Sequence, residues 1–161
     1  YDESTANGQE RERGVRDALA ESGRARVAAS VTTLVEAERA RADTADLLRN
    51  NPEINVVIAF NEPTSVGAAR AVAGLRLADE VFLVGFDSNV ATIDGLQEGY
   101  VDALIVQNPY AMGYLGVESA YKLLTGQDSG LAKTVDTSTQ VVDRENMFSM
   151  DSQKALFAFE Q

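Results

Sequence analysis

The sequence predicts an α/β fold in which a mostly parallel sheet is flanked by helices. Short runs of β-branched residues alternate with longer stretches of helical period, the pattern of successive strand–helix units. The chain has 161 residues, of which 45% are hydrophobic, and this is enough for one compact core. We therefore expect one sheet with helices packed on its faces.

The expected strands are short apolar runs at residues 26–30, 55–60, 81–86, 103–106 and 139–142. The expected helices lie between and after them, at residues 8–22, 33–49, 63–74, 91–98, 109–124 and 153–159.

The first two helices are indicated by their periodicity and their ends. Val15 and Leu19 recur at helical spacing, and Gly23 is placed to end the first helix. Thr33 and Glu36 have the spacing of a capping box, which predicts the start of the second helix.

The later elements follow from their apolar pattern and from proline and glycine. Residues 55–60 are apolar on both faces, as a buried parallel strand requires. Pro63 suits the first turn of the next helix because its missing N–H is not needed there, and Gly74 is expected to end that helix. Pro109 starts another helix in the same way, and Gly126 is its expected cap.

Composition excludes several classes of function. The chain has no cysteine and no histidine, so a disulfide scaffold, a thiol nucleophile, a Ser-His-Asp triad and an ordinary zinc site cannot be built. We expect no metal and no cofactor. Fourteen basic and 25 acidic residues give a net charge of -11, which repels a phosphate backbone, so nucleic acid is not an expected partner.

Polar residues directly follow three of the predicted strands. They are Asn61, Asp87 and Gln107. Each alone is more often a turn or capping residue, but ligands of parallel α/β sheets bind beyond the carboxyl ends of the strands. Together these side chains supply donors and acceptors, as the hydroxyl groups of a sugar require.

Several motifs, taken with their spacing, make the chain resemble the C-terminal half of ribose-type (type I) periplasmic sugar-binding proteins. They are Arg11 with Gly14, Asn61-Glu62, Val84-Gly85-Phe86-Asp87, Gln107-Asn108-Pro109 followed by Met112-Gly113, and Glu145-Asn146-Met147. The resemblance covers nearly the whole chain. It implies a non-catalytic, extracytoplasmic protein that binds a monosaccharide or similar polyol between two lobes and delivers it to an ABC permease.

The resemblance also assigns roles to four residues. Arg11 would donate N–H groups to sugar oxygens, and Asp87 would accept from two neighbouring hydroxyls. Asn61 and Gln107 would each donate and accept. We expect Arg11 and Asp87 to pair with each other when the site is empty.

One departure concerns the aromatic ring that related proteins often present near the start of the second helix, where this chain has Leu34 and Val35. The identity of the sugar stays open. Glu62 followed by Pro63 also differs from the family's more usual acidic pair, which predicts a shifted geometry after Asn61.

The resemblance further implies an incomplete lobe. Residues 1–107 would be the C-terminal lobe without its first helix and strand, residues 108–138 would return toward an absent N-terminal lobe, and residues 139–161 would form the final hinge strand and tail. We therefore expect a segment of a longer polypeptide, whose signal peptide lies elsewhere, stabilised by the N-terminal lobe or by a swapped neighbour.

Two other functions fit parts of the pattern. The first is the effector domain of a LacI-type repressor, which has the same type of fold and hinge as the sugar-binding proteins. A flavodoxin-like hydrolase would use Asp87 as its nucleophile, but no base or glycine-rich phosphate loop accompanies that residue.

Overall fold

The fold is built on one four-stranded sheet, with strand order β1-β2-β3-β4. The computed structural model describes residues 4–127 and 129–157. The strands are β1 (Val56–Ile58), β2 (Phe82–Phe86), β3 (Ala103–Gln107) and β4 (Thr139–Asp143). The pairs β1–β2 and β2–β3 are parallel, and β3–β4 is antiparallel, so the prediction of a mostly parallel α/β fold is confirmed.

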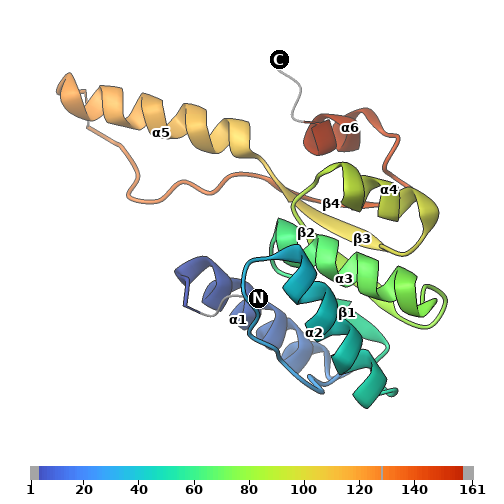
Figure 1. Ribbon diagram of the computed structural model, residues 1–161. Helices are drawn as coiled ribbons and strands as arrows, with labels where there is room; N and C mark the ends of the chain where they lie inside the picture. Colours follow the sequence, from blue (N-terminus) through green and yellow to red (C-terminus); the bar gives the residue numbers. More distant parts are fainter. Residues whose placement is uncertain (1–3, 128, 158–161) are drawn as a thin grey trace.

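Six helices accompany the sheet among the described residues, and Figure 1 shows their arrangement. They are α1 (Ala6–Ser22), α2 (Ala37–Asn50), α3 (Glu62–Leu75), α4 (Val90–Glu98), α5 (Pro109–Leu124) and α6 (Met150–Phe157). The helices α3 and α4 connect successive parallel strands, which is the usual crossover of such sheets. None of the described helices is both long and apolar enough to cross a membrane.

The core lies around β2 and β3, where α3 and α4 cover the sheet. Its largest fully buried side chains include Leu83, Leu96, Leu104, Val72, Val101 and Val142. The outer strand β1 is less covered, and Val56 is 47% exposed. Burial is therefore greatest in the middle of the sheet and falls toward β1.

Close packing of α2 on α3 depends on Gly67. A Cβ atom at this position would lie 2.5 Å from the carbonyl oxygen of Ala37 and 2.6 Å from the Cβ of Ala40. Both distances are too short for any side chain, so glycine lets the two helix backbones approach each other.

Residues 26–30 do not form the predicted strand. Residues 24–34 belong to no helix or strand, and no backbone hydrogen bond joins them to β1 in the described part of the chain. Strand propensity alone does not make a strand, because a strand also needs a neighbour in register.

Several predicted element ends are also corrected. The capping box of Thr33 and Glu36 is absent: Thr33 donates instead to the carbonyl of Leu34 at 3.4 Å, and α2 begins after Glu36 without a side-chain cap. The helix α3 continues past Gly74 to Leu75, and its C-cap is Arg76, whose φ is 58°. The last helix begins at residue 150 rather than 153, and the predicted residues 158 and 159 lie outside the described part.

The helix α5 extends away from the rest of the molecule (Figure 1) and buries none of its residues. Three of its tyrosines are exposed: Tyr110, Tyr114 and Tyr121. Leu123 and Leu124 near its end are 60% and 88% exposed. The cap is Thr125, with the predicted Gly126 next to it at a φ of 70°.

Candidate functional site

The carboxyl ends of β1, β2 and β3 meet at one edge of the sheet because these strands are parallel neighbours. Asn61 lies just beyond β1, Asp87 directly follows β2, and Gln107 is the last residue of β3. The sheet thus places all three predicted residues along the same edge, where Arg11 from α1 joins them.

Arg11 connects the ends of all three strands. Its Nη2 donates to Oε1 of Gln107 at 2.7 Å, and its Nη1 donates to the carbonyl oxygen of Phe60. The guanidinium carbon lies 4.7 Å from the centre of the Phe86 ring, in cation–π geometry. The planar donor group is therefore held in one orientation by contacts with residues far away in the sequence.

Phe60 and Phe86 form an aromatic corner beside Arg11 that sequence reasoning missed. Their ring centres are 5.8 Å apart, with an interplanar angle of 62°. The available signal was that an aromatic residue directly precedes both Asn61 and Asp87. An apolar ring surface is thus present although Leu34 and Val35, near the expected start of the second helix, are exposed aliphatic residues.

Asn61 has a structural role in addition to any binding role. Its Oδ1 accepts hydrogen bonds from the backbone N–H of Thr64 at 3.0 Å and from Oγ1 of Thr64 at 2.8 Å. The backbone N–H of Asn61 donates in return to Oγ1 of Thr64 at 3.2 Å, which completes a capping box for α3. These bonds occupy the acceptor of Asn61 and leave its NH₂ group as the part suited to a ligand.

Asp87 lies at the turn out of β2 in a left-handed conformation, with a φ of 63°. Its backbone N–H donates to the carbonyl of Ile105 at 3.0 Å, which fixes the turn against β3. The expected ion pair between Arg11 and Asp87 does not form among the described residues: Arg11 contacts Phe60 and Gln107 instead. The half-buried carboxylate of Asp87 therefore keeps its acceptor oxygens apart from the arginine.

The starts of α3 and α4 are joined at this edge. Nδ2 of Asn89, the N-cap of α4, donates to Oε1 of Glu62 at 2.8 Å. Among the described residues there is no cluster of three or more Asp, Glu, His or Cys suited to a metal. What the edge offers is a set of fixed donors and acceptors next to aromatic rings.

Comparison with known proteins agrees with this arrangement. The family model for the periplasmic binding protein domain matches residues 2–128. The chain belongs to this family.

Two curated relatives illustrate the similarity. The D-ribose/D-allose-binding protein of Pseudomonas aeruginosa is 29% identical over 141 residues, which cover 86% of this chain and 44% of the relative. The ribose import binding protein of Salmonella typhimurium is 37% identical over 82 residues, covering 51% of this chain and 27% of the relative. The chain thus spans less than half the length of these relatives.

Solved structures agree in fold. An ABC transporter solute-binding protein of Agrobacterium vitis, solved with D-fucose, superposes with a TM-score of 0.84 at 27% identity and covers 91% of this chain and 50% of its own. A carbohydrate transporter solute-binding protein of Agrobacterium radiobacter, in complex with D-arabinose, superposes with a TM-score of 0.86 at 29% identity. The match covers 92% of this chain and 50% of that protein. These relatives are named as transport proteins, which favours that interpretation over a LacI-type regulator or a hydrolase.

Proposed function

We propose that this chain forms part of the solute-binding component of an ABC transporter and contributes one side of a monosaccharide site. The observation that carries the proposal is the position of Arg11, fixed by Phe60, Phe86 and Gln107 at the carboxyl edge of the sheet. A fixed cation in this place presents N–H donors without losing side-chain entropy when a ligand binds.

Each of the four predicted residues has its own role in binding the sugar. Arg11 and the NH₂ group of Asn61 donate to sugar oxygens, and the carboxylate of Asp87 accepts from hydroxyl groups. Gln107 orients Arg11 through its carbonyl and offers its NH₂ group. Bonds of this kind to charged groups contribute about 1.5 to 3 kcal/mol each, and the ring of Phe86 covers an apolar face of the sugar.

The other side of the site would come from a second lobe. The matched relatives are about twice as long as this chain, and α5 presents exposed apolar side chains, including Val117 at 73% and Leu124 at 88%. We assign the docking of that lobe to α5, with closure around the bound sugar. The protein acts outside the cytoplasm and passes its ligand to a membrane permease.

Calorimetric titration of the full-length polypeptide that contains this chain, with D-ribose, D-allose and D-arabinose, tests the proposal. Asp87→Asn removes a charged acceptor with little change in shape, and we expect sugar affinity to fall about 10- to 150-fold, in line with the loss of one charged hydrogen bond. Asp79→Asn is the control, because Asp79 is exposed and precedes β2 at the opposite edge of the sheet.

Unchanged affinity in Asp87→Asn would contradict the site, and absence of binding to any of the three sugars would contradict the ligand class. Release of a chemically altered sugar would show an enzyme instead of a binding protein.

A further inference from the structure

Ser65 is a buried serine of α3 whose hydroxyl group lies between the ends of β1 and β2. Its side chain is 1% exposed. Its Oγ accepts from the backbone N–H of Phe86 at 2.9 Å and lies 2.8 Å from the carbonyl oxygen of Asn61 and 3.0 Å from that of Phe86. Because a hydroxyl group has one proton, these two carbonyls share it while the oxygen accepts from Phe86.

The hydroxyl group binds the backbone of β2 just beyond the end of β1. The N–H of Ala59 donates to the carbonyl of Val84 at 2.9 Å, so Val84 directs its backbone groups toward β1. Alternate residues of a parallel strand direct their backbone groups to the same side. Phe86 therefore turns to this side as well, where its N–H and its carbonyl meet the side chain of Ser65.

Gly85 allows α3 to approach β2 closely at this point. A Cβ atom at position 85 would lie 3.1 Å from both Cβ and Oγ of Ser65, and 3.0 Å from Cδ2 of Leu104. These distances are shorter than ordinary van der Waals contact, so the helix and the strand are already tightly packed. Removal of the hydroxyl group would thus leave the N–H of Phe86 buried without its acceptor.

Phe86 transmits this restraint to Asp87, the next residue. Asp87 has a φ of 63°, which residues with side chains rarely adopt and which persists where the surroundings determine it. Its backbone N–H donates to the carbonyl of Ile105 at 3.0 Å. The turn is therefore held from two sides, by β3 at Asp87 itself and by Ser65 at the residue before it.

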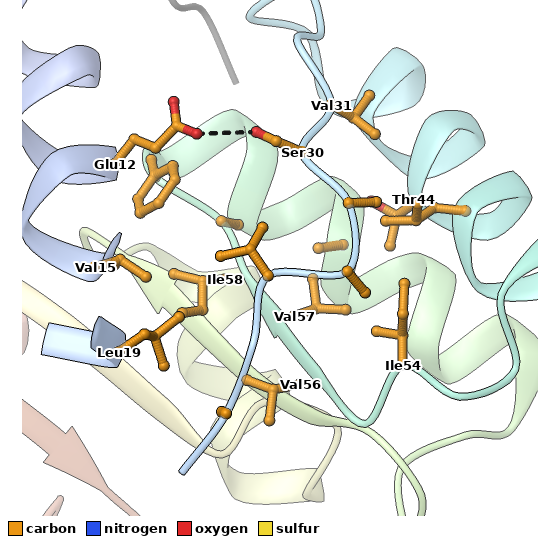
Figure 2. A pocket seen from close by; sticks show the side chains of 18 of the residues that line it. Glu12, Val15, Leu19, Ser30, Val31, Thr44, Ile54, Val56, Val57 and Ile58 are labelled. Carbon is orange, nitrogen blue, oxygen red and sulfur yellow. Dashed lines mark hydrogen bonds between the residues drawn. The ribbon is translucent and has the colours of Figure 1, made fainter. Parts of the chain in front are cut away.

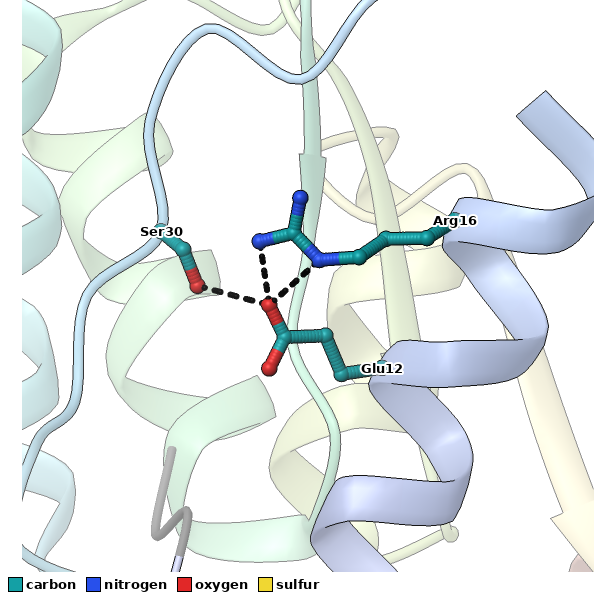
Figure 3. Close-up of polar contacts among 3 residues, drawn as sticks. All are labelled: Glu12, Arg16 and Ser30. Carbon is teal, nitrogen blue, oxygen red and sulfur yellow. Dashed lines mark hydrogen bonds and ion pairs between the residues drawn. The ribbon is translucent and has the colours of Figure 1, made fainter. Parts of the chain in front are cut away.

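Phe86 also supports Arg11, whose guanidinium carbon lies 4.7 Å from the centre of its ring. The helix α1 borders a cavity of about 460 Å³ beside β1 (Figure 2). It is attached to the segment before α2 by the bond from Oγ of Ser30 to Oε1 of Glu12 at 3.2 Å (Figure 3). Because the helix lies over a cavity, the position of the guanidinium group depends on the groups that it contacts. A shift of Phe86 would thus move Arg11 as well as Asp87.

We infer that Ser65 is a positioning residue of the candidate sugar site. Its hydroxyl group fixes the carbonyl of Asn61 relative to the turn of Phe86 and Asp87, and so fixes the donor of one strand end relative to the acceptor of the next. A ligand that bonds to both needs this spacing to be set before it binds. Ser65 is buried and acts through these neighbours, and the assignment rests on the proposed function.

Ser65→Ala tests the assignment, because it removes the hydroxyl group with the smallest change in volume. Calorimetric titration with D-ribose, D-allose and D-arabinose is carried out on the full-length polypeptide that contains this chain, well below its melting temperature. We expect the affinity for the sugar that the parent binds to fall about tenfold, as when one hydrogen bond to the ligand is lost. Ser65→Cys keeps a polar group with weaker hydrogen bonds, and its affinity should lie between those of the parent and Ser65→Ala.

Ser152→Ala is the matched control. Ser152 is a buried serine of α6 that is 0% exposed. Its Oγ accepts from Nε2 of Gln140 at 3.0 Å and donates to Oδ1 of Asn146 at 3.1 Å, and neither partner is a candidate site residue. Both serine-to-alanine variants should lower the melting temperature, whereas only Ser65→Ala should weaken sugar binding. An equal loss of affinity in the two variants would reduce Ser65 to a residue that stabilises the fold, and would overturn the inference.

Hydrogen exchange of the sugar-free protein gives a second test that needs no ligand. The N–H of Leu83, at the other end of β2, donates to Oδ2 of Asp102 at 2.7 Å and reports on the stability of the strand. In Ser65→Ala the exchange rate of Phe86 relative to that of Leu83 should rise about tenfold, because the turn opens locally. In Ser152→Ala this ratio should stay unchanged.

The two measurements separate this inference from the proposed function. Unchanged sugar affinity in Ser65→Ala, or an unchanged exchange ratio, would overturn the role of Ser65. Absence of sugar binding by the parent would overturn the proposed function instead. A raised exchange ratio would then still support Ser65 as the residue that holds the turn of Asp87.

Discussion

The helices α3 and α5 begin in the same way but are buried very differently. Asn61 caps α3 and Asn108 caps α5, and each helix has proline in its first turn. Eight residues of α3 are buried, whereas none of α5 is. The local signals determine where a helix starts, and burial depends on whether neighbouring elements can approach it.

The difference lies in the side chains that each helix presents. The buried residues of α3 are small or β-branched, such as Gly67, Ala68 and Val72, and α2 packs closely on them. The helix α5 carries large apolar residues, such as Tyr114 and Leu124, that stay exposed. Substitutions of the same kind in the two helices should therefore have different effects.

The largest difference is expected for glycine to alanine. Gly67→Ala places a methyl group 2.5 Å from the carbonyl oxygen of Ala37, and the forced separation of α2 and α3 should lower the free energy of unfolding by about 3 kcal/mol. Gly116→Ala on α5 meets no atom within 4 Å and should cause no loss. Urea denaturation followed by circular dichroism measures both, and equal effects would contradict the described packing of α2 on α3.

Valine to alanine gives the next largest contrast. Val72 is 0% exposed in α3 and Val117 is 73% exposed in α5. Val72→Ala should cost about 2 kcal/mol through lost burial and a small cavity. Val117→Ala should stay within about 0.5 kcal/mol. A comparable loss at Val117, measured in the same denaturation experiment, would mean that α5 is buried against another surface in solution.

Removal of the two asparagine caps compares the helix starts themselves. Asn61→Ala leaves the N–H of Thr64 without its 3.0 Å partner and should destabilise the whole fold by about 1 kcal/mol. Asn108→Ala removes the 2.9 Å bond to Ala111 and should loosen only the first turn of α5. Hydrogen exchange distinguishes a global from a local change, and a global change in both variants would show that α5 unfolds together with the core.

The smallest effect concerns the surface contact between α2 and α3. Arg41, and then Arg70, lower the pKa of Glu38 below its ordinary value of 4.5. Because the folded-state pKa is the lower one, the stabilisation is present above the unfolded-state pKa and is lost as the pH falls through the folded-state value.

Arg70→Ala removes the 2.8 Å ion pair with Glu38, so its melting temperature should lie slightly below that of the parent at pH 7 and converge with it in acid, once the pH lies below the lowered pKa of Glu38. Lys122→Ala removes the 2.8 Å pair with Glu118 on α5 and should leave the main transition unchanged at both pH values. A constant difference for Arg70→Ala across this range would contradict the contribution of Glu38.

Elements that depend on local signals could be predicted from the sequence alone. The start of α5 at Pro109 and the run of parallel strands follow from proline chemistry and from apolar residues on both strand faces. The strand predicted at residues 26–30 failed because pairing is not a local property. These residues line a cavity of about 460 Å³ beside β1 and belong to no strand.

The shared position of the candidate site residues was predictable, but their contacts were not. Parallel topology brings Asn61, Asp87 and Gln107 to one edge, whereas Arg11 was assigned only through the family resemblance. Arg11 and Gln107 are 96 residues apart, a separation at which sequence pattern carries no contact information. Arg11 contacts the neutral oxygens of Phe60 and Gln107 instead of the carboxylate of Asp87. This pairing depends on side-chain geometry that appears only in the folded chain.

The aromatic residues of α5 determine what an optical experiment on this chain observes. The chain has no tryptophan and five tyrosines, and Tyr110, Tyr114 and Tyr121 all lie on that helix, with the rings of Tyr110 and Tyr114 stacked 6.2 Å apart. Ultraviolet emission therefore reports mainly on this projecting helix, whereas peptide-bond circular dichroism reports on all helices. The two signals would follow different events: docking of a partner changes the first, and melting of the sheet and its covering helices changes the second.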